Sequence, residues 1–187
     1  MIFRPTPFNQ EGVNMKRAAC LSIAIAVLAL AALPLWATQQ VTVVGESLKQ
    51  HGFEHVVFIG DSGGNQSGME NAAAALNERW GANRAHFVPE FYRYRDVFTY
   101  MEEELGIAET QRDGHHDDYV ITTLMMVTDP ETVRWQQRVA AGQASINGLS
   151  IADQEQAIEI GKKLMQFRVD TTVEAINAAI GASTAGR

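Results

Sequence analysis

The feature that most constrains this chain is a short apolar run that leads directly into a glycine-rich turn. Val56 to Ile59 are hydrophobic without alternation, and Gly60, Gly63 and Gly64 follow in the stretch Gly-Asp-Ser-Gly-Gly-Asn. Such an unbroken run is typical of a strand buried on both faces of a parallel sheet. The pattern predicts an α/β fold with a polar turn at the carboxyl end of a buried strand, where open sheets bind ligands. A purely structural turn would give the same local pattern.

Other apolar runs and their end signals predict the remaining elements. We expect strands over residues 55–59 and 85–88, and helices over residues 41–50, 67–80, 95–105, 131–141 and 152–167, with residue 180 as the alternative end of the last helix. Ser67 and Glu70 have the spacing of a capping box for the second helix. The run 121–127 suits a strand or a helix, and residues 146–149 suit a tight turn. Strands interleaved with helices indicate an α/β layer fold.

The N-terminal segment has the pattern of a targeting sequence. Lys16 and Arg17 precede Ala18 to Ala37, which carries no charge. A basic start, an apolar stretch and a small final residue are typical of a secretory signal peptide. A run of about 20 uncharged residues could also span a bilayer as an uncleaved anchor. We therefore expect residues 1–37 to be a signal peptide with a polar extension, or alternatively a membrane anchor, and the protein to be exported to the periplasm or secreted.

Charge and cysteine content narrow the classes of function. The chain of 187 residues has a formal net charge of −7, which argues against nucleic-acid binding. Its one cysteine, Cys20, lies in the N-terminal segment, so the exported part has no disulfide or thiol chemistry. Residues 181–187 are small and polar, and we expect them to form a disordered tail.

A second polar cluster lies between residues 113 and 119. It contains two imidazoles, His115 and His116, and three carboxylates, which include Asp117 and Asp118. Oxygen and imidazole ligands suit zinc, manganese or iron, and a metal-bound water is a nucleophile near neutral pH. A solvated acidic loop is the alternative interpretation of the same residues.

Two further runs leave alternatives open. Aromatic and arginine side chains interleave over residues 91–95, where they could line a pocket or cover the sheet. Met125 and Met126 are expected in the core rather than at a soft-metal site.

Together, the two polar clusters resemble the creatininase family of creatinine amidohydrolases. The family has an Asn-Gly-His-Gly-Gly-Asn turn after a strand, and residues 60–65 of this chain match it. A later His-Ala-Gly-Glu-x-Glu-Thr-Ser segment corresponds to residues 116–123, and the Asp-Pro that follows corresponds to Asp129 and Pro130. The likeness extends from about Glu46 to Ile180.

The resemblance implies an incomplete three-layer α/β/α sandwich with few parallel strands over residues 38–180. It also implies divalent metals (zinc or manganese), hydrolysis of a small cyclic or linear amide, and assembly into homo-oligomers. Carried over by position, the candidate residues are His116 for catalysis, Asp61, Asp117 and Asp118 for the metal, and Ser62, Gly63, Gly64, Asn65 and His115 for the substrate.

The chain also departs from the family pattern. Ser62 stands where the family has a metal-binding histidine, and Tyr119 and Ile121 stand where it has glutamates. Residues 38–52 are too few for the ligand-bearing region that precedes the turn in the family, so the chain resembles an N-terminally truncated member. An altered or incomplete metal site is therefore expected. The alternative function is a non-catalytic binding or assembly protein that retains part of the fold.

Overall fold

The computed structural model describes residues 38–112 and 117–184. In chain order the elements are a helix over residues 38–50, β1 (Val56–Phe58), α2 (Gly63–Trp80), β2 (Ala85–Phe87), the 3-10 helix η1 (Pro89–Tyr92), α3 (Tyr94–Glu103), α4 (Tyr119–Thr128), the 3-10 helix η2 (Pro130–Val133), α5 (Trp135–Ala140), β3 (Ser145–Ile146), β4 (Leu149–Ser150) and α6 (Gln154–Thr184). The predicted α/β class with few parallel strands is confirmed.

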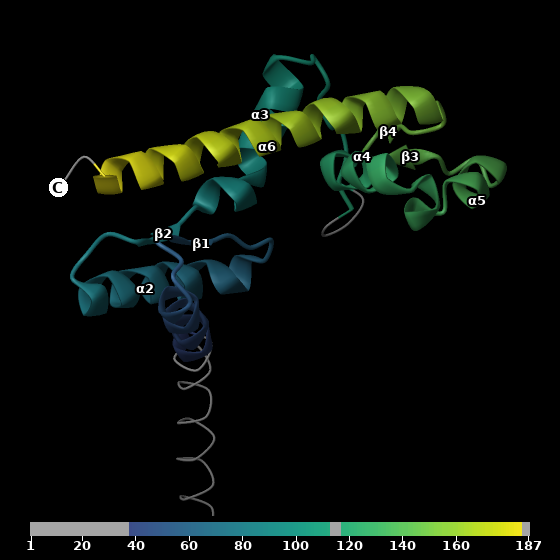
Figure 1. Cartoon of the computed structure of the whole chain (residues 1–187). Coiled ribbons are helices and arrows are strands. Elements are labelled where there is room, and N and C mark those ends of the chain that lie inside the picture. Colours follow the sequence, from purple (N-terminus) through teal and green to yellow (C-terminus); the bar gives the residue numbers. More distant parts are fainter. Residues whose placement is uncertain (1–37, 113–116, 185–187) are drawn as a thin grey trace, which may run out of the picture.

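The sheet half of the molecule consists of residues 38–88. Its strands β1 and β2 are parallel, with Val56 paired to Ala85 and Phe58 to Phe87. Figure 1 shows this strand pair between α2 on one side and α6 on the other. Leu76 of α2 is fully buried against the strands, together with Ala73 and Ala85. The incomplete sheet is thus covered by helices on both faces.

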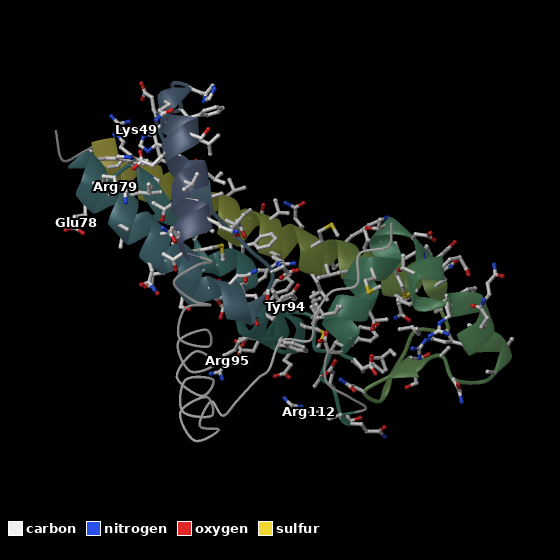
Figure 2. The ribbon with its side chains drawn as sticks, turned by 90° about the horizontal axis from the view of Figure 1, so that it is seen from below. Lys49, Glu78, Arg79, Tyr94, Arg95 and Arg112 are labelled. Carbon is white, nitrogen blue, oxygen red and sulfur yellow. The ribbon has the colours of Figure 1, made fainter. Side chains whose placement is uncertain are left out.

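Polar contacts attach the 38–50 helix to the end of α2. The carboxylate of Glu46 accepts hydrogen bonds from Arg79 and from the indole nitrogen of Trp80, both at 3.0 Å. The ammonium of Lys49 lies 4.6 Å from the centre of the Trp80 ring. Lys49 and Arg79 accordingly lie at one end of the molecule, whereas Tyr94 lies near its middle (Figure 2).

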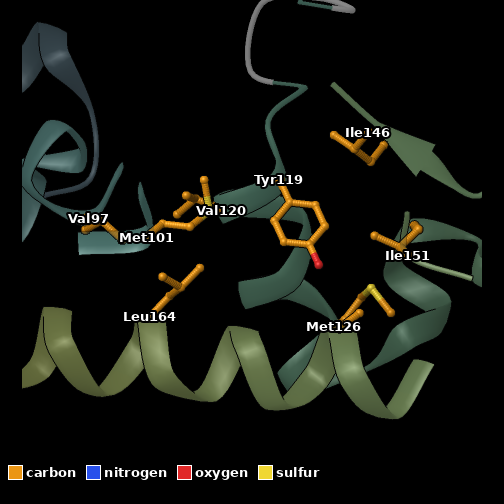
Figure 3. Close-up of a cluster of buried hydrophobic side chains, with 9 residues drawn as sticks. Val97, Met101, Tyr119, Val120, Met126, Ile146, Ile151 and Leu164 are labelled. Carbon is orange, nitrogen blue, oxygen red and sulfur yellow. The ribbon is translucent and has the colours of Figure 1, made fainter. Parts of the chain in front are cut away.

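The helical half consists of α3 and residues 117–184, and it holds the larger core. Tyr119 stands in the middle of this core, with Met101 and Val120 on one side and Ile146 and Ile151 on the other (Figure 3). The most extensive contact between elements in the described part of the chain is that of α4 with α6. Gly161 permits it, because an added Cβ there would clash with the backbone of Thr123.

Side-chain hydrogen bonds fix the start of α4 and its attachment to the β3–β4 hairpin. Asp118 caps α4, since its Oδ1 accepts a hydrogen bond from the Ile121 amide at 2.7 Å. Glu109 joins α4 to the hairpin, because its carboxylate accepts from the Tyr119 amide at 2.6 Å and from the Asn147 side chain at 2.9 Å. Asn147 and Gly148 have φ values of 49° and 85°, which are typical of the two-residue turn predicted at this point.

The 31-residue helix α6 joins the two halves. It contacts β2 and η1 on the sheet side, and α3 and α4 on the helical side. None of the helices in the described part of the chain has both the length and the hydrophobicity needed to cross a bilayer.

The structure corrects several sequence predictions. Helix α2 begins at Gly63 with Ser62 as its N-cap, four residues before the predicted capping box at Ser67. The ambiguous run 121–127 is helical, because Asp118 caps it. The predicted helix 131–141 is broken at Arg134, whose φ of 52° separates η2 from α5.

Two more predictions require correction. The expected tail is helical over residues 181–184, where α6 continues, and residues 185–187 lie outside the described part. Met126 is fully buried as predicted, but Met125, its neighbour on α4, is 41% exposed.

Candidate functional site

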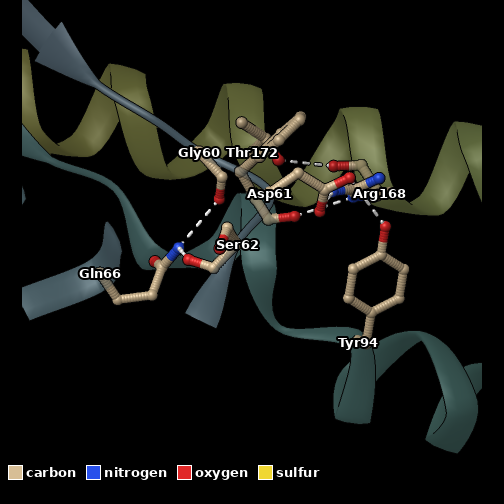
Figure 4. A network of polar contacts seen from close by, with 8 residues as sticks. Gly60, Asp61, Ser62, Gln66, Tyr94, Arg168 and Thr172 are labelled. Carbon is tan, nitrogen blue, oxygen red and sulfur yellow. Dashed lines mark hydrogen bonds and ion pairs between the residues drawn. The ribbon is translucent and has the colours of Figure 1, made fainter. Parts of the chain in front are cut away.

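An ion pair at the end of β1 organises the polar turn. Asp61 Oδ1 accepts a hydrogen bond from Arg168 Nη2 of α6 at 2.6 Å, and its Oδ2 accepts one from the Tyr94 hydroxyl at 3.1 Å (Figure 4). The Asp61 side chain is 50% exposed, whereas that of Arg168 is 14% exposed. The carboxylate thus faces solvent from one side while a buried guanidinium holds it from the other.

Arg168 is itself held in place by aromatic rings. Its Nε donates to the Phe91 carbonyl oxygen at 2.8 Å. Its guanidinium lies 4.1 Å from the centre of the Phe91 ring and 4.6 Å from that of Tyr94. A planar guanidinium fixed by stacking and by a backbone acceptor is well oriented for a carboxylate.

Burial raises the pKa of Tyr94 to about 12, and the nearby Asp61 carboxylate contributes while Arg168 opposes the shift. Tyr94 therefore keeps its proton at neutral pH and acts as a hydrogen-bond donor. Its donation to Asp61 is consistent with this state.

The glycine-rich turn is shaped by its own side chains. The Gln66 amide nitrogen donates to the carbonyl oxygens of Gly60 and Ser62, at 3.0 and 2.9 Å (Figure 4). Ser62 is the N-cap of α2, but its hydroxyl makes no capping hydrogen bond. A Cβ on Gly63 would lie 2.8 Å from the Tyr92 hydroxyl, so glycine is required for this close approach.

A hollow of about 660 Å³ opens over the turn, and we call it the turn pocket. The residues that line it come from the turn, the aromatic run and the start of α4: Asp61, Ser62, Gly63, Gly64, Tyr92, Tyr94, Asp118 and Ile121. Its volume is within the range of small-molecule sites, about 300 to 1,000 Å³. Two segments that are separate in the sequence, the glycine-rich turn and the start of α4, thus meet at one hollow.

The predicted site residues divide into three groups. Asp61, Ser62, Gly63, Gly64 and Asp118 line the turn pocket. Asn65 and Asp117 are exposed and are not part of its lining. His115 and His116 lie outside the described residues.

The described residues do not fit a metal ion. Within residues 38–112 and 117–184, no group of three or more His, Cys, Asp or Glu side chains is arranged to hold one. Asp61 is already paired with a guanidinium, which would repel a cation at the same carboxylate. Asp118 already serves as a helix cap.

A separate group of polar side chains, which we call the histidine cluster, lies at the opposite, amino end of the strand pair. His55 Nδ1 and His86 Nε2 are 3.0 Å apart, and Arg84 Nη1 lies 3.2 Å from His55 Nε2. Because a guanidinium only donates, His55 Nε2 must accept and its Nδ1 must carry the proton that His86 accepts. Burial, with contributions from His55 and Arg84, lowers the pKa of His86. The His86 ring is therefore neutral in this arrangement.

Arg168 is the principal site residue that sequence patterns do not reveal. It lies 107 positions from its partner Asp61. The signal that could have found it is its spacing, because Leu164, Arg168 and Thr172 recur every four residues and so share one face of α6. A charged residue between two buried positions on a helix face needs a partner.

Fold and site together define an α/β protein with a hollow at the carboxyl end of a parallel strand. The family model for creatininase (creatinine amidohydrolase) matches residues 33–177, which is most of the chain. The chain therefore belongs to the creatininase family. A search of curated proteins found no match, and a search of solved structures found none either.

Proposed function

We propose that the turn pocket binds a small amide and that the protein is a creatininase-type amidohydrolase whose metal ligands include residues beyond the described part. The observation that carries the binding step is the lining of the turn pocket, which combines helix-start amides with carboxylates. Membership of an amidohydrolase family supports the class of ligand.

An amide group complements this lining. Its carbonyl oxygen needs donors, and the backbone N–H groups at the start of an α-helix have no partner within the helix. Gly63 and Gly64 supply such groups at the start of α2. The amide N–H needs an acceptor, which the half-exposed carboxylate of Asp61 supplies at the same hollow. Donors at a helix start also stabilise the oxyanion that develops when an amide is attacked.

Hydrolysis is the less supported step. Members of the creatininase family typically bind a divalent metal, but the described residues do not form such a site. We propose that zinc or manganese binds only with the help of His115 and His116. The second candidate function is amide binding without turnover, which is favoured by the pairing of Asp61 with Arg168.

Metal analysis and turnover separate the two candidates. The full-length protein is purified, its zinc and manganese contents are measured, and creatinine and linear amides are incubated with and without each metal. The hydrolase predicts metal-dependent turnover that is lost in His116→Ala and Asp61→Asn. The non-catalytic alternative predicts binding without turnover. Absence of both binding and turnover would contradict both candidates.

We also propose that the protein is exported and that it forms homo-oligomers. The uncharged run 18–37 after Lys16 and Arg17 supports export. The short parallel sheet, in which β1 and β2 pair only with each other within the described part of the chain, supports association. N-terminal sequencing of the mature protein and light scattering coupled to size-exclusion chromatography test these two proposals. Intact chain in the cytoplasm, or a monomer at all concentrations, would contradict them.

A further inference from the structure

A second hollow, of about 330 Å³, lies beside the turn pocket, and we call it the apolar pocket. Its lining is almost entirely hydrophobic. The side chains that matter here come from the end of β1, from η1, from α4 and from α6: Ile59, Phe91, Leu124, Met165, Val169 and Val173. This pocket has no role in the amide-binding step described above.

The two pockets are neighbours because the same segments line both. Ile59 lines the apolar pocket, and Asp61, two residues later, lines the turn pocket. On α4, Leu124 lines the apolar pocket, and Ile121, one helical turn earlier, lines the turn pocket. Arg168 lines the apolar pocket and bonds to Asp61 in the turn pocket. The Asp61–Arg168 ion pair is thus the boundary between a polar compartment and an apolar one.

The apolar pocket exposes hydrophobic surface that a ligand could cover. Ile59, Val169 and Val173 are 45%, 48% and 49% exposed. The pocket's two polar lining residues are already engaged: the Thr172 hydroxyl donates to the Arg168 carbonyl oxygen at 2.7 Å, and the Arg168 guanidinium bonds to Asp61 and to the Phe91 carbonyl oxygen. A polar head group would therefore gain little here, whereas an apolar group would gain from leaving water.

We propose that the apolar pocket receives an apolar substituent of the amide whose polar head binds in the turn pocket. This inference rests on the proposed function. It narrows the substrate class to small amides that carry an aliphatic or aryl group, and it excludes fully polar amides as the preferred ligands. The amide head lies against the start of α2, and the substituent passes the Asp61–Arg168 pair to reach Val169 and Val173.

A homologous series of amides tests this proposal on the full-length protein. Acetamide, butyramide and hexanamide are titrated while backbone amide and valine methyl signals are followed by NMR. Each buried methylene contributes about a fourfold gain in affinity, so hexanamide, with four methylenes more than acetamide, is expected to bind on the order of 200-fold more tightly. Its binding should shift both the Gly63 and Gly64 amide signals and the Val169 and Val173 methyl signals.

Matched variants identify the pocket responsible. Val173→Asn should remove most of the gain with chain length and leave acetamide binding unchanged. Val139→Asn is the control, because Val139 is 40% exposed on α5 and lines neither pocket. Equal affinities for the three amides, or a gain that survives in Val173→Asn, would overturn the inference.

The outcomes also separate this inference from the function on which it rests. If acetamide and hexanamide bind equally at the Gly63 and Gly64 amides, the inference fails and amide binding stands. If hexanamide shifts only the Val169 and Val173 methyl signals, or if no amide binds, both fail. Methyl signals that change on dilution without any amide binding would identify the apolar pocket as a surface between copies of the chain, which also overturns the inference.

Discussion

Among the described residues, the helical half gathers all nine of its buried hydrophobic side chains into one cluster, whereas the sheet half gathers only three of its seven. The sheet half depends instead on polar attachments. Asn77 of α2 accepts hydrogen bonds from the Arg84 and Ala85 amides at 2.8 and 2.7 Å, and donates to the Ala85 carbonyl oxygen. Three of those seven are alanines, against one of the nine in the helical half, so the sheet half buries less apolar surface and gains less from the hydrophobic effect. The sheet half, which carries the turn pocket, should therefore open before the helical half.

The crossing of α4 and α6 offers the largest test of this comparison. Gly161→Ala would place a methyl group against the backbone of Thr123, which cannot move aside as a side chain can. We expect the free energy of unfolding to fall by more than about 3 kcal/mol, at the upper end of overpacking effects. Chemical denaturation measures this loss.

The same helix supplies the control. Gly181→Ala adds a methyl group where nothing lies within 4 Å of the new Cβ. Alanine has the higher helix propensity, so this variant should be neutral or more stable by up to about 1 kcal/mol. Equal losses in the two variants would show that the α4–α6 contact is not what Gly161 protects.

Leu76 tests the sheet half. Its side chain is fully buried, and Leu76→Ala should cost about 3 kcal/mol through lost burial and a residual cavity. Amide hydrogen exchange should then become faster in β1 and β2 while α4 and α6 stay protected. The matched variant Leu164→Ala, in the larger core, should increase exchange in both halves. Equal exchange across the molecule in Leu76→Ala would mean that the halves unfold as one unit.

The histidine cluster gives the sheet half a dependence on pH. The pKa of His86 is lower in the folded chain than its ordinary value of 6.5. Its contribution to stability is therefore complete above about pH 6.5 and is lost as the pH falls toward the folded pKa, by at most about 1.4 kcal/mol per pH unit. Thermal unfolding between pH 7.5 and 5 measures this slope.

His86→Gln should flatten the pH dependence, because glutamine cannot take up the proton. His51→Gln is the control, since His51 is exposed at the end of the 38–50 helix. An unchanged slope in His86→Gln would assign the acid sensitivity to other groups.

The ion pair between the halves should have the smallest effect on stability. Because the Asp61 side chain is 50% exposed, Asp61→Asn should cost about 0.5 kcal/mol. Arg168→Met should cost more, about 1 to 2 kcal/mol, since it also removes the hydrogen bond to Phe91. A larger loss in Asp61→Asn than in Arg168→Met would show that the carboxylate, not the guanidinium, carries the contact.

Much of the fold follows from local sequence signals. The apolar run before Gly60 and the turn at Asn147 predict β1 and the hairpin, and Gly81 ends α2 in the left-handed conformation that glycine favours. The start of α2 was predicted four residues late. Ser67 and Glu70 have the spacing of a capping box but lie inside the helix, whereas the actual N-cap, Ser62, makes no side-chain capping hydrogen bond. The run 121–127 could not be assigned from periodicity alone, since it is apolar on most faces.

The site could be predicted only in part. Asp61 and the turn glycines were found because they follow a buried strand. Arg168 could not be paired with Asp61, because contacts across 107 positions depend on how α6 crosses the sheet rather than on any local pattern. The same crossing creates the apolar pocket, which no single segment of the sequence encodes.

The position of α6 along the chain also affects folding during synthesis. The ribosome completes α6 after every element that it contacts, since β2, η1, α3 and α4 all precede Gln154. At about 5 to 20 residues per second, several seconds separate the emergence of the strands from that of the helix. During this interval Arg168 is not available to Asp61, and Ile59 lacks its neighbours on α6. The nascent sheet half therefore presents apolar surface that a holding chaperone could cover until the helix arrives.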